Sequence, residues 1–241
     1  MPYRKRIFIY SQGKMEEKYF TYRLGGKRTR ERNFQKTPDD VARVNARRAE
    51  RNLMELILTN FHREDIYLTL TYAEEPKDYQ DAKKKIQHFL RSLRRAYRKK
   101  GKELKYIYTT EYKGKRIHHH ILLNAGADRE EIQSLWKHSR INYYAYLHYD
   151  GGEEDAKRLA AYFIKETEKT VREGKQKVRY VASRNLKKPE VHYRTIQSKK
   201  WKEVPIPPKG MECYEVINAY TSSGYPMQLA RYRKRGRQKD D

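Results

Sequence analysis

The part of the chain that decides the fold is residues 106–124, with the sequence YIYTTEYKGKRIHHHILLN. Two runs rich in β-branched and aromatic residues, Tyr106–Tyr112 and Arg116–Asn124, flank a short polar segment that contains Gly114. Such runs on either side of a short glycine-containing segment are typical of antiparallel strands joined by a tight turn. The stretch therefore predicts a β-hairpin.

The length of the turn sets which residues face one another across this hairpin. If Gly114–Lys115 is a two-residue loop, Glu111 pairs with His118 and Thr109 pairs with His120. A three-residue turn would shift the register and move Glu111 to the other face of the sheet. Only the two-residue turn places a carboxylate beside an imidazole.

Alternation along the second strand separates the three consecutive histidines. His118 and His120 point to one face and His119 to the other, because successive strand side chains alternate. The apolar residues that share the face of His119 are Ile117, Ile121 and Leu123. With Glu111 beside His118, two imidazoles and a carboxylate converge in a set that suits a catalytic divalent metal. The alternative is a solvated polar run or an adventitious metal tract, which composition alone does not exclude.

The charge of the chain indicates a polyanionic partner. Lys and Arg total 56 against 31 Asp and Glu, which gives a formal net charge of +25, and the chain has 22 tyrosines. A strongly positive protein attracts polyanions, and aromatic residues between the cations favour unstacked nucleic-acid bases. We find no strongly amphipathic segment or lipidation signal that would favour a membrane surface, so we expect no membrane partner.

The number of cysteines indicates whether a protein suits a reducing or an oxidising cellular compartment. Cys213 is the single cysteine, so the chain can form neither an internal disulfide nor a cysteine-built zinc site. This composition fits a reducing cytoplasm, and we expect a bacterial host cytoplasm.

Hydrophobic periodicity predicts the elements on both sides of the hairpin. Residues 66–72 alternate strictly and predict a strand whose core side carries Ile66, Leu68, Leu70 and Tyr72. Helical spacing predicts helices over 37–61, 78–100, 128–137 and 155–172, and further strands are predicted over 6–10, 19–23, 141–149 and 211–220.

The order strand, helix, strand, strand, helix, strand between residues 66 and 149 is typical of a ferredoxin-like or RRM-like plan. In that plan an antiparallel sheet carries its helices on one side. We therefore predict an α+β fold with terminal extensions. The expected parts are an N-terminal extension and helix packed on the core (1–61), the core (62–186), a C-terminal extension (187–230) and a basic disordered tail (231–241).

A later helix carries the candidate nucleophile. Arg158, Tyr162, Lys165 and Lys169 follow one another at steps of four, three and four, so they share one face of the helix over 155–172. A phenol flanked by three cations is suited to meeting a phosphodiester. We expect the cations to favour the phenolate, which is the reactive form of a group with an ordinary pKa of about 10.

These residues resemble the motifs of the HUH endonucleases, and most closely those of rolling-circle replication initiators of bacteriophages and small plasmids. The likeness covers about Val41 to Thr195. Residues 116–123, RIHHHILL, resemble the second motif of the family, although Ile117 stands where members often carry proline. An acidic residue seven positions before the first ligand histidine is also a family habit, and Glu111 occupies that place.

The resemblance extends to three further segments. The strand over 66–72 resembles the first motif, which would place Thr69 and Thr71 on the floor of the site. Residues 162–165, YFIK, resemble the Tyr-x-x-Lys motif, with Tyr162 as nucleophile and Lys165 as its catalytic partner. Residues 183–189 look like the Ser-Arg-x-Leu-x-x-Pro stretch of phage-type initiators. The resemblance and the charge pattern together assign DNA contacts to Thr69, Thr71, Arg116, Arg158, Lys169 and Arg184.

One departure from the phage pattern concerns the number of nucleophiles. Some relatives carry a second tyrosine four residues after the first, and Glu166 fills that position in this chain. We therefore expect a single-tyrosine enzyme.

The resemblance implies a metal-dependent single-strand DNA endonuclease and strand transferase. Glu111, His118 and His120 would hold Mg²⁺ or Mn²⁺, and Tyr162 would form a 5′-phosphotyrosine link while a free 3′-hydroxyl primes rolling-circle replication. Its partners would be single-stranded DNA or an origin hairpin, with a host helicase and polymerase, because the chain has no Walker motif. Two alternatives remain: a single-strand transposase with the same chemistry, and a non-enzymatic RRM-like nucleic-acid-binding protein.

Overall fold

The computed structural model describes residues 3–20, 38–113, 116–147, 153–172, 178–197, 201–220 and 224–235. The chain forms two compact units, one of Thr37–Lys187 and one that joins Met1–Lys36 to Lys188–Asp241. This division differs from the expected parts in that the N-terminal strands belong with the C-terminal segment, whereas the first helix belongs with the core on which it was expected to pack. The candidate catalytic residues all fall in the unit Thr37–Lys187.

The sheet of the unit Thr37–Lys187 is antiparallel and has the strand order β6-β3-β5-β4-β7. Its strands are β3 (Ile66–Leu70), β4 (Tyr106–Lys113), β5 (Arg116–Leu123), β6 (Ile141–Tyr146) and β7 (Val181–Ala182). The fold is α+β, as the sequence predicts. Strand β3 lies beside the histidine strand β5, so residues of both strands can share one face of the sheet.

One face of this sheet packs against α2 (Tyr79–Lys99) and α3 (Arg129–Leu135). The helix α2 begins where the Asp78 carboxylate accepts a hydrogen bond from the Asp81 backbone N–H at 2.8 Å, which satisfies a free N–H of the first turn. The buried side chains of α2 recur at helical spacing, and they are Ala82, Ile86, Phe89, Leu90, Leu93 and Tyr97. They meet the core-facing strand residues that alternation predicts, including Ile66, Leu68 and Leu70.

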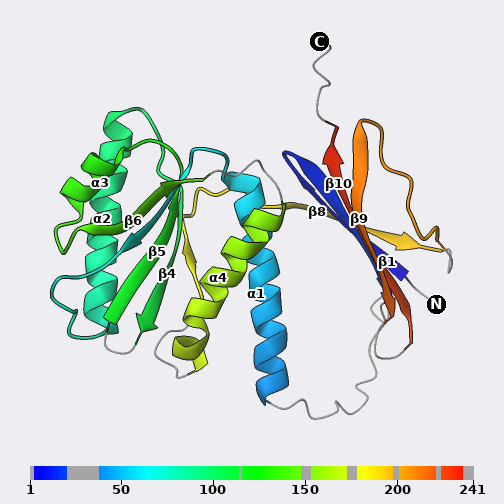
Figure 1. Cartoon of the computed structure of the whole chain (residues 1–241), viewed down its shortest axis with the longest axis horizontal. Coiled ribbons are helices and arrows are strands. Elements are labelled where there is room, and N and C mark those ends of the chain that lie inside the picture. Colours follow the sequence, from blue (N-terminus) through cyan, green and yellow to red (C-terminus); the bar gives the residue numbers. More distant parts are fainter. Residues whose placement is uncertain are drawn as a thin grey trace. The chain divides into compact units, whose positions relative to one another are not determined.

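The opposite face lies under α1 (Pro38–Asn60) and α4 (Glu153–Arg172), as Figure 1 shows. The helices of the predicted plan over 66–149, α2 and α3, do lie on one face, and the other face is covered by helices from outside that segment. Helices α1 and α4 contact each other, and α4 also contacts β4. The buried part of α1 lies in its second half, at Leu53, Met54, Ile57 and Leu58, whereas Val44 in its first half is 47% exposed.

The other unit is a second antiparallel sheet with the order β8-β1-β2-β10-β9. Its strands are β1 (Tyr3–Tyr10), β2 (Gly13–Phe20), β8 (Glu190–Ile196), β9 (Met211–Tyr220) and β10 (Pro226–Lys234). The predicted strand 211–220 is confirmed. The second N-terminal strand begins at Gly13 rather than at residue 19, because the turn after Tyr10 is short. Residues 231–234, which were assigned to a disordered tail, belong to β10.

The sequence shows no segment that favours a membrane surface. No described helix is both long and apolar enough to cross a membrane. The glycine pair Gly25–Gly26 and Lys27 are followed by Arg28 instead of the Ser or Thr of a Walker motif, and this segment lies outside the described residues.

His119 is part of the hydrophobic core. Its side chain is fully buried, and its ring nitrogens lie 2.6 Å from the Tyr72 hydroxyl and 3.0 Å from the Thr110 hydroxyl. Trp136 meets the imidazole edge to face. Burial lowers the pKa of His119 from its ordinary value of 6.5 to about 3. The central histidine of the run is therefore a structural residue that remains neutral in the folded protein.

This burial predicts a loss of stability in acid. Because the folded-state pKa of His119 lies below the unfolded value, protonation favours the unfolded chain, and stability falls as the pH drops below about 6.5. The contribution of one such group is at most about 1.4 kcal/mol per pH unit. In His119→Gln the free energy of unfolding should change less between pH 7 and pH 5.

Urea unfolding followed by the helical circular dichroism signal measures this effect, because the four helices among the described residues belong to the unit Thr37–Lys187. His88→Gln, at an exposed position on α2, is the matched control and should retain the wild-type pH dependence. Equal pH slopes for the two variants would contradict the prediction.

Candidate active site

The hairpin has the register that a two-residue turn predicts. Lys113 pairs with Arg116, Glu111 with His118 and Thr109 with His120. Because alternate strand residues share a face, Glu111, His118 and His120 lie on the same side of the sheet. This is the side that α4 covers, away from the core that contains His119.

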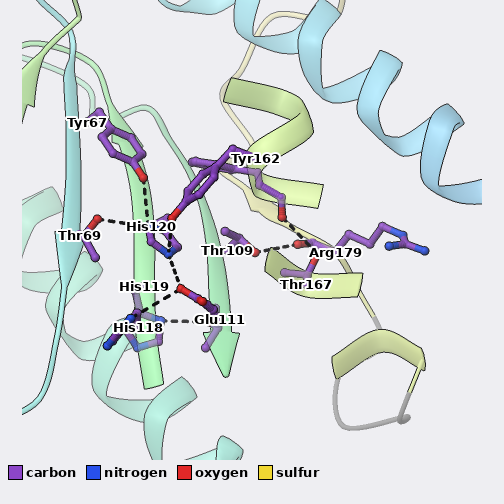
Figure 2. A network of polar contacts seen from close by, with 12 residues as sticks. Tyr67, Thr69, Thr109, Glu111, His118, His119, His120, Tyr162, Thr167 and Arg179 are labelled. Atoms are coloured by element: carbon purple, nitrogen blue, oxygen red, sulfur yellow. Dashed lines mark hydrogen bonds and ion pairs between the residues drawn. The ribbon is translucent and has the colours of Figure 1, made fainter. Parts of the chain in front are cut away.

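The Glu111 carboxylate joins the two histidines. Its Oε2 atom lies 2.9 Å from His120 Nε2 and 3.6 Å from His118 Nδ1. Glu111 is 8% exposed and His120 is 3% exposed, whereas His118 is half-buried at the edge of the group. The cluster Glu111–His118–His120 is therefore a mostly buried group with one more open member (Figure 2).

Two hydroxyl groups of β3 fix the ring of His120. The Tyr67 hydroxyl lies 3.0 Å and the Thr69 hydroxyl 3.1 Å from His120 Nδ1. Burial lowers the pKa of His120 from 6.5 to about 4, and the nearby Glu166 charge offsets part of that effect. The imidazole is therefore neutral at pH 7, and a neutral ring has the lone pair that a metal ligand needs.

Tyr162 reaches this cluster from α4. Its hydroxyl lies 3.3 Å from His120 Nε2, and the two rings meet edge to face with centroids 5.0 Å apart. Figure 2 shows the tyrosine directed from the helix toward His120 and Glu111. The side chain is 37% exposed, so the hydroxyl is held by the cluster while the residue remains open to solvent.

The electrostatic surroundings of Tyr162 differ from those expected. Burial and then the negative charges of Glu166 and Glu111 raise the pKa of Tyr162 to about 12. The prediction that the cations of α4 favour the phenolate is wrong for this structure. Lys165 is exposed and acts on Glu166, and exposed Arg158 lies 3.4 Å from Asp155, so these cations do not outweigh burial and the two carboxylates beside the hydroxyl. The Tyr162 side chain is therefore a neutral phenol in this structure.

Glu166 is a site residue that the sequence analysis did not assign. It follows Tyr162 by four residues, so the two side chains share one face of α4. Burial and a hydrogen bond with Glu111 raise the pKa of Glu166, because two carboxyl groups this close cannot both be ionised without repulsion. The spacing of four residues between Tyr162 and Glu166 is the signal in the sequence that could have identified Glu166. In the sequence analysis, position 166 indicates only that a second tyrosine is absent.

Tyr67 is the second residue that was missed. It alternates with Ile66 and Leu68, so the predicted core face of β3 already implied that Tyr67 points toward the histidine side. Its ring packs against Tyr143 and Phe163. Beside it lies a cavity of about 450 Å³ whose lining includes Tyr143, Tyr146 and Arg158.

The remaining predicted DNA-contact residues are distributed unevenly. Thr69 is buried against His120, and exposed Arg116 lies two residues before His118 on the same face. Thr71 follows the end of β3 and accepts a hydrogen bond from Trp136 through its carbonyl. The side chain of Lys169 lies outside the described residues.

Arg184 is far from the histidines. It lines a cavity with Arg94, Arg98 and Tyr106, at the end of β4 opposite Glu111. Along the strand, Tyr106 and Glu111 are separated by roughly 17 Å. The structure therefore does not bring Arg184 into the cluster.

The donor set fits a divalent cation by its chemistry, since it contains neutral imidazole and a pair of crowded carboxylates. Within the described residues, however, no group of three or more His, Cys, Asp or Glu side chains has an arrangement that could hold a metal ion. The Glu111 oxygen contacts the imidazole nitrogens directly. Binding of a cation would require this carboxylate to move away from His120.

The charges in the cluster predict a titration that NMR can measure. In metal-free protein, the His120 imidazole resonances should stay unchanged from pH 8 to pH 5. Glu166→Gln should lower the pKa of His120 further, because the Glu166 charge raises it. Glu168→Gln, at an exposed position on the same helix, is the control and should have no effect. Titration of His120 near its ordinary pKa would contradict the geometry.

Part of the chain is similar to a known protein family. Residues 65–148 match the family model described as Replication-associated protein ORF2/G2P. The matched segment contains Glu111, His118 and His120 and ends before α4, so it does not include Tyr162. No curated protein and no solved structure gave a significant match to the chain. Over less than half of its length, the chain is similar to replication-associated proteins, and this similarity supports a replication-associated role.

Proposed function

We propose that the protein is a metal-dependent single-strand DNA endonuclease and strand transferase that initiates and terminates rolling-circle DNA replication. The observation that carries the proposal is the position of the Tyr162 hydroxyl, 3.3 Å from His120 Nε2 in a cluster with Glu111. A nucleophile and a polar cluster that meet at one open position are the parts that phosphoryl transfer needs. The similarity to replication-associated proteins supports the biological role.

The proposed reaction is a transesterification. The Tyr162 oxygen forms a bond to the scissile phosphorus while the bond from phosphorus to the 3′ oxygen breaks. The products are a 5′-phosphotyrosine link and a free 3′-hydroxyl, and the hydroxyl takes up the proton that the phenol loses. Because one phosphodiester replaces another, the reverse attack by a 3′-hydroxyl can rejoin the strand and close a circle.

In this proposal, the cluster Glu111–His118–His120 also binds a divalent cation. Glu111, His118 and His120 would hold Mg²⁺ or Mn²⁺, which would stabilise negative charge on the reacting phosphate. The lowered pKa of His120 supports this assignment, because the ring does not need to lose a proton before it binds a cation near pH 7. Tyr67 and Thr69 orient the same ring through its other nitrogen.

The surface beside Tyr67 supports a single-stranded substrate. Tyr143 is about half exposed, and it lines the 450 Å³ cavity next to Tyr67 together with Arg158. Exposed aromatic rings stack with unpaired bases, and a neighbouring guanidinium can bind a phosphate. A splayed strand can present its backbone to Tyr162 while its bases occupy this surface.

The central test is covalent adduct formation. Incubation with single-stranded oligonucleotides of varied sequence and Mn²⁺ should give an adduct that survives denaturation on a gel. Tyr162→Phe should abolish the adduct and keep DNA affinity within about twofold, because it removes one hydroxyl and no charge. Tyr180→Phe, on another tyrosine of the unit, should behave like the wild type.

The outcomes separate the alternatives. A non-enzymatic binder forms no adduct with or without metal, and that result would overturn the proposal. An adduct that persists in Tyr162→Phe would assign the nucleophile elsewhere. Joining of transposon-end sequences rather than a replication origin would favour the transposase.

A separate prediction concerns the metal. His120→Ala should lose the stimulation of adduct formation by Mn²⁺ and lower its rate by about 10²- to 10³-fold, the usual loss when transition-state charge stabilisation is removed. His88→Ala on α2 is the control and should retain the metal response. Equal stimulation by Mn²⁺ in the wild type and in His120→Ala would exclude His120 as a ligand.

A further inference from the structure

The sheet β8-β1-β2-β10-β9 carries a cavity that the proposed nicking chemistry does not use. The cavity has a volume of about 480 Å³. It is lined by Lys5, Lys18, Arg194, Thr195, Ile196, Gln197 and Trp201. Three of these side chains are cationic, one is a large aromatic, and no acidic residue is among the described residues that line it.

The strand register places the three cations in a row. Lys5 on β1 is directly opposite Lys18 on β2 and directly opposite Arg194 on β8. Neighbouring strands lie about 4.8 Å apart, so the row spans roughly 10 Å across the sheet. Like charges at opposed positions destabilise a sheet. An anionic ligand with more than one charge would remove that repulsion.

The acidic residue nearest to the row neutralises it only in part. Glu16 lies 2.8 Å from Lys5 Nζ and 2.6 Å from Lys14 Nζ, so one carboxylate is shared by two lysines. Lys18 donates instead to the neutral side-chain oxygen of Gln228 at 2.7 Å. Burial and the charge of Lys5 lower the pKa of Lys18. The row therefore keeps a net positive charge.

A fully buried amide holds the aromatic wall of the cavity in place. Gln228 donates through Nε2 to the backbone carbonyls of Lys202 at 2.9 Å and Glu203 at 3.1 Å, directly after Trp201. The Trp201 ring meets Tyr3 edge to face at 5.1 Å, and Lys18 Nζ lies 5.6 Å from its centre. Gln228 thus fixes both a cation and the segment that carries the indole, which makes this a preorganised site.

We propose that this cavity is a second binding site for single-stranded DNA, with backbone phosphates on Lys5, Lys18 and Arg194 and a base against Trp201. The repeated charge of a nucleic-acid backbone matches a row of cations better than a single small anion does. The aromatic wall is useful only to a base that has left its stack, and a duplex keeps its bases inside. The inference needs no cleavage chemistry and goes beyond the proposed nicking site.

The test compares two variants with the same change of charge. Binding of a fluorescein-labelled oligothymidylate is measured by anisotropy at several salt concentrations, with EDTA present. Arg194→Glu, at an exposed position, should weaken binding at least tenfold, roughly the loss of one charge-assisted hydrogen bond. It should also reduce the salt slope by about one. Lys234→Glu, exposed on β10 and outside the cavity, should weaken binding by no more than about twofold.

Tryptophan fluorescence provides a second readout. The chain has two tryptophans, and Trp136 is 1% exposed in the core of the other unit, so a change on DNA addition reports Trp201. Oligothymidylate should quench this signal. At the same DNA concentration, Arg194→Glu should show little quenching and Lys234→Glu should behave like the wild type.

Two results would overturn the inference. One is an equal loss of affinity and of salt slope in Arg194→Glu and Lys234→Glu, which would indicate a general charge effect. The other is equal quenching by a duplex of the same length, which would exclude selection of an unstacked base. Because neither measurement depends on cleavage, failure here is distinguishable from failure to form the Tyr162 adduct.

Discussion

The pairing of β4 with β5 is the constraint on which the candidate active site depends. One register places Glu111 opposite His118 and sends His118 and His120 toward α4, while His119 enters the core between Tyr72 and Trp136. A slip by one residue would exchange these faces. It would bury His118 and His120 among apolar side chains and expose His119. The apolar residues Ile117 and Ile121 therefore fix the chemistry as well as the fold.

Burial keeps both central groups of the site, His120 and Tyr162, uncharged. Burial keeps His120 neutral, which suits a ligand, but the same desolvation and the carboxylates of Glu111 and Glu166 keep Tyr162 protonated. In our proposal, the cation that the carboxylates attract is the group that would reverse this balance. Crowded carboxylates without a counterion repel one another, which is unfavourable in the resting site. In our proposal, the same repulsion favours the binding of a cation.

Strand register also gathers the side chains of the site that we propose in the second sheet. Its cations Lys5, Lys18 and Arg194 come from three strands that are distant in the sequence, and their opposed positions concentrate charge that is otherwise spread along the chain. Each unit thus has an aromatic and cationic surface suited to unpaired DNA. In the proposed function, a nicking enzyme that must hold both a scissile phosphate and flanking strand would use both surfaces.

The sequence by itself determined the hairpin, the separation of His119 from its neighbours and the helix that carries Tyr162, and it left two hairpin registers open, of which the structure has the one set by a two-residue turn. These features follow from periods of two and 3.6 residues, which are local. Only the tertiary structure decided what covers each face: α1 and α4 over the histidines, Tyr67 against His120, and Glu166 beside Glu111. It also decided the raised pKa of Tyr162, because desolvation and charge depend on neighbours from other strands and helices. Only the tertiary structure shows the contact between Lys18 and Gln228, because these residues are 210 positions apart and the contact has no local signal in the sequence.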